Sequence, residues 1–135
     1  MDILKEWEQK AIEYIFSHPG AATPERVSDY DWGEAFAYAA TPETYPGSAV
    51  LTTPFAREDV LVVIAAEDGE GDGASWVGVF LLKDGRFAVL RAGCDFTGWD
   101  CQAGGSANVA ESLESLVRFG LSQDERDRLN FKMVI

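Results

Sequence analysis

The first forty residues alternate apolar and polar positions at the spacing of α-helices. Apolar residues recur every three or four positions over 2–17, which predicts an amphipathic helix that ends before Pro19-Gly20. A threonine followed by a proline opens 23–26 as one or two short helical turns. The aromatic and alanine residues of 31–40 line one side of a second helix, and the prolines of 41–48 then predict a loop.

The middle of the chain changes to the patterns of β-strands. A β-branched run over 59–66 predicts a first strand, which a glycine-rich acidic loop follows. Two further strands, 75–83 and 86–92, are joined by Asp84-Gly85, a strong hairpin signal. Residues 106–110 predict a fourth, short strand after a loop.

Two short helices are predicted near the C-terminal end. The apolar residues of 112–119 fall on one side, and Gly120 follows at the position that commonly ends a helix. Ser122 and Glu125 form a capping box that opens a last helix over 123–129. This order predicts an α+β fold with an antiparallel sheet of three to four strands, N-terminal helices and two C-terminal helices.

The composition fits one folded domain over residues 1–135. Apolar residues make up 47% of the chain, which is enough for a hydrophobic core. The longest apolar stretch, 60–66, has the length of a strand, so we expect no contact with a membrane. The first residues are acidic, unlike a secretory signal, and we therefore expect a cytoplasmic location in a bacterium or a phage-infected host cell.

Acidic residues are concentrated in one segment of the chain. Residues 28–82 hold ten of the 23 acidic residues but only Arg57 of the 11 Lys and Arg, and the whole chain has a net charge of −12. A field of one sign repels nucleic acid and attracts cationic surfaces. We therefore expect a basic protein surface as partner and no direct binding of nucleic acid.

Aromatic residues lie among these acids and are typical anchors of protein interfaces. Trp32 has helical spacing to Phe36, so the sequence leaves two roles open for it, interface and core. The predicted partner-binding residues combine the carboxylates with these aromatic anchors: Asp29, Tyr30, Asp31, Trp32, Glu34, Glu67, Asp68, Glu70 and Asp72.

The acidic loop 68–73 satisfies the first half of a calcium-binding EF-hand pattern. Carboxylates fall at its first, third and fifth positions, and a glycine at the sixth. The position that should supply a bidentate glutamate is Val79, inside a predicted strand. A solvated hairpin loop is therefore favoured over a calcium site.

The string Cys94-Asp95-Phe96-Thr97-Gly98-Trp99-Asp100-Cys101 is the most distinctive in the chain. Cys94 and Cys101 are weak candidates for metal ligands, because structural zinc sites space their cysteines more closely and need a second pair. A disulfide would be possible in an oxidising compartment, which we do not expect here. The favoured interpretation is structural: Asp95 and Thr97 hydrogen-bond the loop, Gly98 supplies a special backbone angle and Trp99 folds over the sheet end. No cofactor is predicted.

The sequence predicts a protein without enzymatic activity. A nucleophilic cysteine needs a base or a positive neighbour, whereas Asp95 and Asp100 stand beside the two cysteines. The only histidine, His18, ends the first predicted helix, where it interacts with the helix dipole. No base, nucleophile and orienting group can be named together.

The C-terminal half carries a resemblance. Residues 81–87, the string from Ala92 through Cys94–Cys101 to Gln102, and then 113–129 resemble small acidic uncharacterised proteins of bacteria and their phages. The Cys-Asp-Phe-Thr-Gly-Trp-Asp-Cys string marks that family and implies no activity. In size and charge alone the chain also resembles inhibitors of host defence such as anti-CRISPR proteins, some of which imitate DNA with carboxylates.

Three functions follow as hypotheses. The first is an interaction protein, of the phage inhibitor type, that binds a basic surface on a protein that handles nucleic acid. The second is an immunity-type protein that neutralises a toxin by the same electrostatics. The third is a small metal-binding or ligand-binding domain centred on 94–101.

Overall fold

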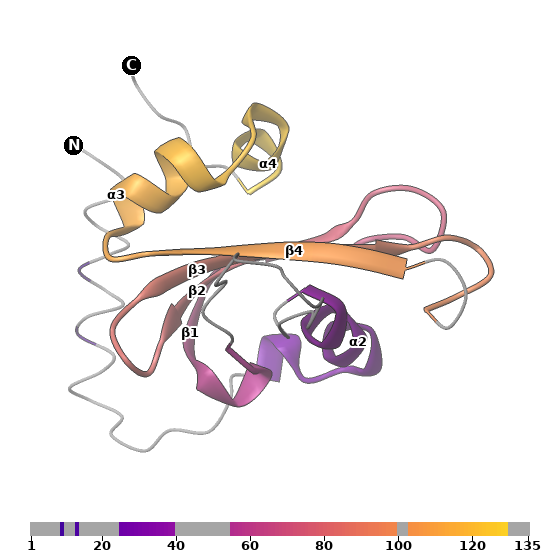
Figure 1. Ribbon diagram of the computed structural model, residues 1–135, viewed down its shortest axis with the longest axis horizontal. Helices are drawn as coiled ribbons and strands as arrows, with labels where there is room; N and C mark the ends of the chain where they lie inside the picture. Colours follow the sequence, from indigo (N-terminus) through magenta and orange to yellow (C-terminus); the bar gives the residue numbers. More distant parts are fainter. Residues whose placement is uncertain (1–8, 10–12, 14–24, 40–54, 100–102, 130–135) are drawn as a thin grey trace, which may run out of the picture.

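The fold is a four-stranded antiparallel sheet with helices on both faces (Figure 1). The computed structural model describes residues 9, 13, 25–39, 55–99 and 103–129. The strands follow one another in sequence order across the sheet. Helix α2 lies on one face, and the C-terminal helices cover the other (Figure 1). This confirms the predicted α+β class.

The elements are η1 (Glu25–Val27), α2 (Tyr30–Ala39), η2 (Arg57–Asp59), β1 (Val60–Glu67), β2 (Trp76–Leu82), β3 (Phe87–Cys94), β4 (Ala103–Ala110), α3 (Leu113–Ser115), η3 (Leu116–Gly120) and α4 (Gln123–Arg128).

The predicted hairpin between β2 and β3 is confirmed. The Leu82 carbonyl accepts the Gly85 N–H at 2.9 Å, and Gly85 has a φ of +92°, which favours glycine. The Asp84 carboxylate accepts the Arg86 N–H at 3.0 Å and so stabilises the turn. Every residue of β2 is buried, because this central strand is covered on both faces.

Strand β4 begins three residues earlier than the sequence predicts. It pairs with β3 from Ala103 to Ala110, although two of its first three residues are glycines of low β-propensity. A Cβ on Gly105 would lie 2.6 Å from the Arg91 carbonyl oxygen and 2.9 Å from the Ala39 Cβ. The glycine therefore lets α2 lie directly on the sheet, and this packing extends the strand.

The two faces of the sheet bury different kinds of side chain. The face under the C-terminal helices is aliphatic, and the face under α2 is rich in aromatic rings. The aliphatic core comprises Leu61, Val77, Val79, Leu81, Phe87, Val89, Leu113, Leu116, Val117, Leu121 and Leu129. The aromatic core comprises Val27, Trp32, Ala35, Phe36, Phe55, Val60, Trp76, Phe80, Leu82, Ala88, Leu90, Ala92 and Trp99.

The C-terminal helices form as predicted, with one difference. The Ser112 side chain accepts the Ser115 N–H at 3.2 Å and begins α3. The chain then continues as η3, which is a π-helix instead of the α-helix that the sequence predicts. Arg126 donates to the Val117 and Leu121 carbonyls, at 3.0 Å each, and so satisfies groups that a helix end leaves without partners.

The last predicted helix, α4, begins at its capping box as expected. The Ser122 side chain accepts the Glu125 N–H at 3.1 Å, and the Glu125 carboxylate accepts the Ser122 N–H at 2.9 Å. The helix predicted over 2–17, with His18, and the loop predicted over 41–48 lie outside the described residues. Within the described part of the chain, no helix is long and apolar enough to cross a bilayer.

Candidate functional site

Most of the predicted partner-binding residues lie at the first turn of α2 and in the loop after β1, whereas Glu67 ends β1 and binds Arg128 of α4. Asp29 precedes the helix, and its carboxylate accepts the Trp32 N–H at 2.8 Å, which is the role of an N-cap. The Arg57 guanidinium donates to the Val27 and Asp29 carbonyls at 3.2 and 3.0 Å. The one cation of the acidic segment thus holds the start of α2 against η2.

Trp32 belongs to the core, which settles the two roles that the sequence left open. Its side chain is fully buried, and its ring packs edge-on against Phe80 with centroids 6.3 Å apart. It therefore cannot serve as an exposed anchor, and that part of the predicted site is wrong. The helical spacing of Trp32 and Phe36 reflects one buried side of α2.

The indole of Trp32 binds one of the predicted acids. Its Nε1 donates to the Asp68 carboxylate at 2.8 Å, and Arg26 donates to the same oxygen at 3.0 Å. The indole hydrogen bond is the main cause that lowers the pKa of Asp68, and the Arg26 guanidinium adds to it, while partial burial opposes both. Asp68 therefore stays ionised while it connects the β1–β2 loop to α2.

A second indole bond connects α2 to the β3–β4 loop, this time with the indole on the loop and the carboxylate on the helix. Trp99, buried in the β3–β4 loop, donates its Nε1 to the Asp31 carboxylate of α2 at 3.0 Å. The Tyr38 ring stacks on Trp99 with centroids 5.8 Å apart, and its hydroxyl donates to the Trp99 carbonyl at 2.7 Å. The first turn of α2 is therefore held between two loops at the same end of the sheet.

The β3–β4 loop has the structural role that the sequence predicts. The Asp95 carboxylate accepts hydrogen bonds from the Thr97 N–H, at 2.9 Å, and from the Thr97 hydroxyl. Gly98 has a φ of +94°, and Trp99 folds over the aromatic core. Cys94 is a half-buried thiol, while Cys101 lies outside the described residues. Desolvation raises the pKa of Cys94, and Asp31 and Asp95 raise it further, so this thiol is a poor nucleophile.

Two exposed aromatic side chains accompany the carboxylates at this end. Tyr30 is 70% exposed at the start of α2, and Phe96 is 82% exposed at the tip of the β3–β4 loop. The two loops are neighbours, because a Cβ on Gly71 would lie 3.8 Å from the Asp95 carbonyl oxygen. We call this surface the acidic end, and its residues are Tyr30, Asp31, Asp68, Glu70, Asp72, Asp95 and Phe96.

Phe96 and Asp95 were not predicted as partner-binding residues. A phenylalanine between an aspartate and a Thr-Gly pair falls at the tip of a tight turn, where it cannot reach the core. That position is the signal in the sequence that would have identified it.

The remaining predicted acids differ in how far their charge is compensated. Glu67 binds Arg128 at 3.1 Å, on the side of the C-terminal helices, and Asp68 binds Arg26. Glu34 is half-buried one turn along α2 from Tyr30. Within the part of the chain that the structure describes, Glu34, Glu70 and Asp72 form no ion pair.

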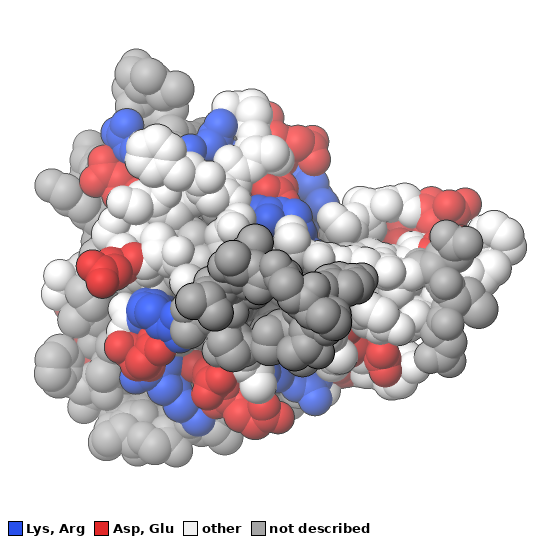
Figure 2. All heavy atoms as spheres, in the orientation of Figure 1, with Lys and Arg blue, Asp and Glu red and all other residues white. Residues whose placement is uncertain are grey.

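The visible face of the molecule shows the same distribution. Figure 2 shows acidic and basic atoms interleaved over the body of the protein. At the end where the β1–β2 and β3–β4 loops project, acidic atoms are visible without basic ones (Figures 1 and 2). The sequence segment 28–82 is thus only partly a continuous acidic surface, since its Glu67 faces the C-terminal helices.

The acidic loop itself is held by glycine and by one backbone hydrogen bond. The Glu70 N–H donates to the Ala74 carbonyl at 2.7 Å, and a Cβ on Gly69 would collide with the Ala74 oxygen and the Trp76 ring. Among the described residues, no group of three or more histidine, cysteine or acidic side chains could hold a metal ion. The segment forms the loop of the β1–β2 hairpin, with this one backbone hydrogen bond across it.

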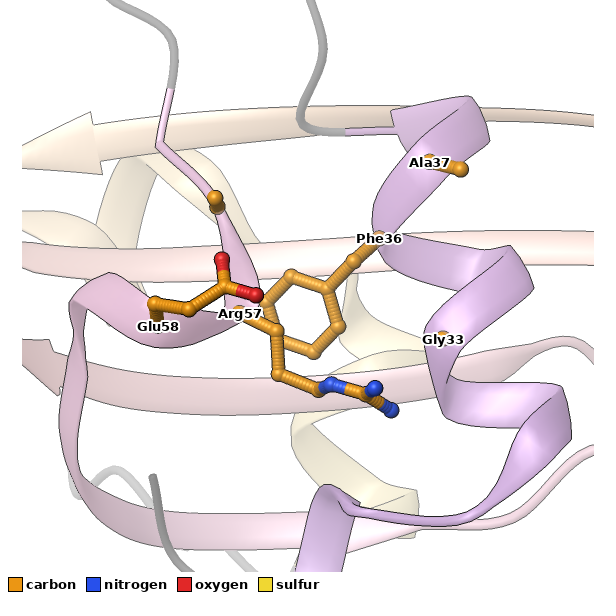
Figure 3. A pocket seen from close by; sticks show the side chains of 6 residues that line it. Gly33, Phe36, Ala37, Arg57 and Glu58 are labelled. Atoms are coloured by element: carbon orange, nitrogen blue, oxygen red, sulfur yellow. The ribbon is translucent and has the colours of Figure 1, made fainter. Parts of the chain in front are cut away.

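A shallow pocket of about 190 Å³ lies between α2 and η2 (Figure 3). The Phe36 ring forms its floor, and the side chains of Arg57 and Glu58 lie at its rim. Arg57 is already bound to the carbonyls at the start of α2, so the pocket offers no nucleophile paired with a base.

The chain matches no protein-family model, no curated protein and no solved structure. The resemblance of the Cys94–Cys101 string to small bacterial and phage proteins therefore stays a prediction.

Proposed function

We propose that this chain is a non-enzymatic interaction protein whose acidic end binds a basic surface on another protein. A surface that normally contacts nucleic acid is the expected target, because such surfaces carry clustered lysine and arginine. An inhibitor of the phage type would act in this way, by occupying the surface in place of a nucleic acid backbone.

The observation that carries the proposal is the combination of charge and exposed rings at one end of the sheet. Glu70 and Asp72 lie there without an ion pair among the described residues, while the charge of Asp68 is shared with Arg26. Tyr30 and Phe96 expose aromatic surface beside them. Charges of this kind speed the encounter, and desolvated aromatic rings slow dissociation.

The test replaces acids that do not hold the fold. The variant Glu70→Lys/Asp72→Lys is compared with Glu114→Lys/Asp124→Lys, which changes the net charge equally on the side of the C-terminal helices. Proteins captured from a bacterial lysate are quantified by mass spectrometry at about 50 to 300 mM salt. We expect the first variant to lose basic proteins about tenfold and the second to retain them.

An equal effect of the two variants would contradict the proposal, as would capture that is indifferent to salt. Phe96→Ser supplies a separate measurement, since it removes an anchor without altering charge. It is expected to speed dissociation from the captured partner and to leave the association rate unchanged.

A further inference from the structure

The two edges of the sheet differ in regularity. Edge strand β1 pairs with β2 through two irregularities, between Val60 and Val62 and between Val63 and Ala65. Edge strand β4, at the rim of the sheet in Figure 1, pairs with β3 over eight consecutive residues without interruption. Bulges twist an edge away from further pairing, so β1 is protected and β4 is not.

The composition of β4 also lacks the usual protection of an edge. Its eight residues are alanine, glycine, serine, asparagine and valine, with no charge and no proline. Lysine, proline or an inward-pointing charge normally prevents an edge strand from adding another strand. Gly104, Gly105, Ser106 and Asn108 are exposed, and in the described part of the chain β4 pairs with β3 alone.

The hydrogen bonds of the β2–β3 hairpin establish which groups of β4 point outward. The Leu82 N–H donates to the Arg86 carbonyl, so Leu82 faces β3, and the Lys83 N–H donates in the opposite direction, to Asp59. Alternation along antiparallel strands then directs Phe87 and every second residue of β3 toward β4. The N–H and C=O groups that point away from β3 therefore belong to Ala103, Gly105, Ala107 and Val109.

We propose that this β4 edge accepts an extended segment of a basic partner as a fifth strand. Strand addition uses main-chain hydrogen bonds for affinity, and β4 offers the outward N–H and C=O groups of four alternate residues for such bonds. This inference rests on the proposed function for the partner's charge, while the edge geometry is independent of it.

Charge selects such a partner over a second copy of this chain. A net charge of −12 opposes self-association. Carboxylates also lie at both ends of the uncharged strand: Asp95 in the loop before it and exposed Glu111 directly after it. An added strand that carries lysine or arginine at its two ends complements this arrangement.

The test measures hydrogen exchange of the β4 amides by NMR. The probe is the synthetic peptide Lys-Lys-Thr-Val-Thr-Val-Thr-Val-Lys-Lys. In the free protein we expect fast exchange at Gly105, Ala107 and Val109 and slow exchange at Ser106 and Asn108, whose amides face β3. The peptide is expected to slow the first group at least about fivefold.

Ala107→Pro removes one outward N–H, which an edge strand tolerates, and should abolish the protection. Ala107→Ser retains the N–H and should preserve it. If Ala107→Pro does not fold, the exchange rates of the wild-type protein with and without the peptide still show whether the outward amides of β4 accept an added strand.

The outcomes separate this inference from the proposed function. Charge-dependent capture at the acidic end without protection of the β4 amides would overturn the added strand alone. Protection by the peptide, together with equal capture by the Glu70→Lys/Asp72→Lys and Glu114→Lys/Asp124→Lys variants, would overturn the proposed function alone. Slow exchange of the outward amides in the free protein would also overturn the inference, because the edge would then already be covered. Sedimentation would show whether a second copy or the chain itself covers it.

Discussion

The two faces of the sheet differ in the donors that their carboxylates bind. Arginines donate on both faces, since Arg26 binds Asp68 and Arg57 binds the carbonyls at the start of α2, but indole donors are found among the described residues only on the α2 face. On the α2 face, carboxylates accept hydrogen bonds from the neutral indoles of Trp32 and Trp99. On the other face, arginines donate to carboxylates and to carbonyl oxygens, as Arg91 does to Glu125 and to the Gly120 carbonyl. Both arrangements satisfy polar groups near a core, but their effects on charge differ.

A neutral donor leaves the charge of its acceptor in place, whereas a guanidinium cancels it. Asp31 therefore fixes α2 and still contributes to the field of the acidic end. Glu125 fixes α4 but adds almost no negative charge to the field around the protein, because Arg91 binds its carboxylate bidentately. The fold thus keeps the charge of Asp31 on the α2 side while Asp31 still holds the helix, whereas Asp68 is bound by Arg26 as well as by the indole.

The largest effect is expected at the Arg91–Glu125 pair. Glu125→Gln leaves the Arg91 guanidinium without a countercharge in a site that is mostly buried, and should lower the free energy of unfolding by about 3 kcal/mol. Glu114→Gln is the matched control, because Glu114 and Arg118 form an exposed pair worth below about 0.5 kcal/mol. Urea unfolding measures both, and equal effects would contradict the importance of burial.

A smaller effect is expected at the indole bond of the α2 face. Trp32→Phe removes the donor to Asp68 together with some buried surface, and should cost about 1 to 3 kcal/mol. A double-mutant cycle with Asp68→Ala, which removes the acceptor, isolates the hydrogen bond, for which we expect a coupling of about 1 to 2 kcal/mol. Additive effects of the two substitutions would show that packing alone holds Trp32.

Acid should weaken both faces, since the pKa of Asp68 and of Glu125 is lowered in the folded state. Burial raises the pKa of Glu125, but the bonds from Arg91 and from the Ser122 N–H outweigh it. Each carboxylate stabilises the fold fully above its usual pKa, 3.8 or 4.5, and the contribution is lost as the pH falls through the lower folded value. Unfolding measured from about pH 7 to pH 2 should therefore show falling stability below about pH 4.5, with a shallower fall in Asp68→Asn.

The smallest effect is expected at Cys94. Its raised pKa means that the thiol form stabilises the fold below the usual value of 9.0 and that this contribution is lost as the pH rises through the higher folded value. In a Cys101→Ala background, the alkylation rate of Cys94 should reach its midpoint above about pH 9. A midpoint below that value would contradict the raised pKa that burial, Asp31 and Asp95 together give this thiol.

The strands, their turn and the capped helices could be predicted because local chemistry specifies them. Asp84-Gly85 and the Ser122–Glu125 capping box act within a few residues, and the structure confirms both. The early start of β4 and the burial of Trp32 depend on contacts with distant elements, so periodicity alone could not decide them. Only part of the acidic end was predicted. Most of its charge comes from segment 28–82, which the sequence singled out, whereas its exposed Phe96 comes from the β3–β4 loop, which was not predicted as a binding surface.

The indole bond of Asp68 links the shape of the acidic end to its ionisation. The Trp32 N–H lowers the pKa of Asp68, so this carboxylate holds α2 most strongly when charged, and a nearby cation favours that charged form. A cationic protein seated on this end would therefore tighten the helix it touches, and the complex should melt at a higher temperature than the isolated chain. Partner binding and the rigidity of α2 would then reinforce each other through the same Asp68 carboxylate.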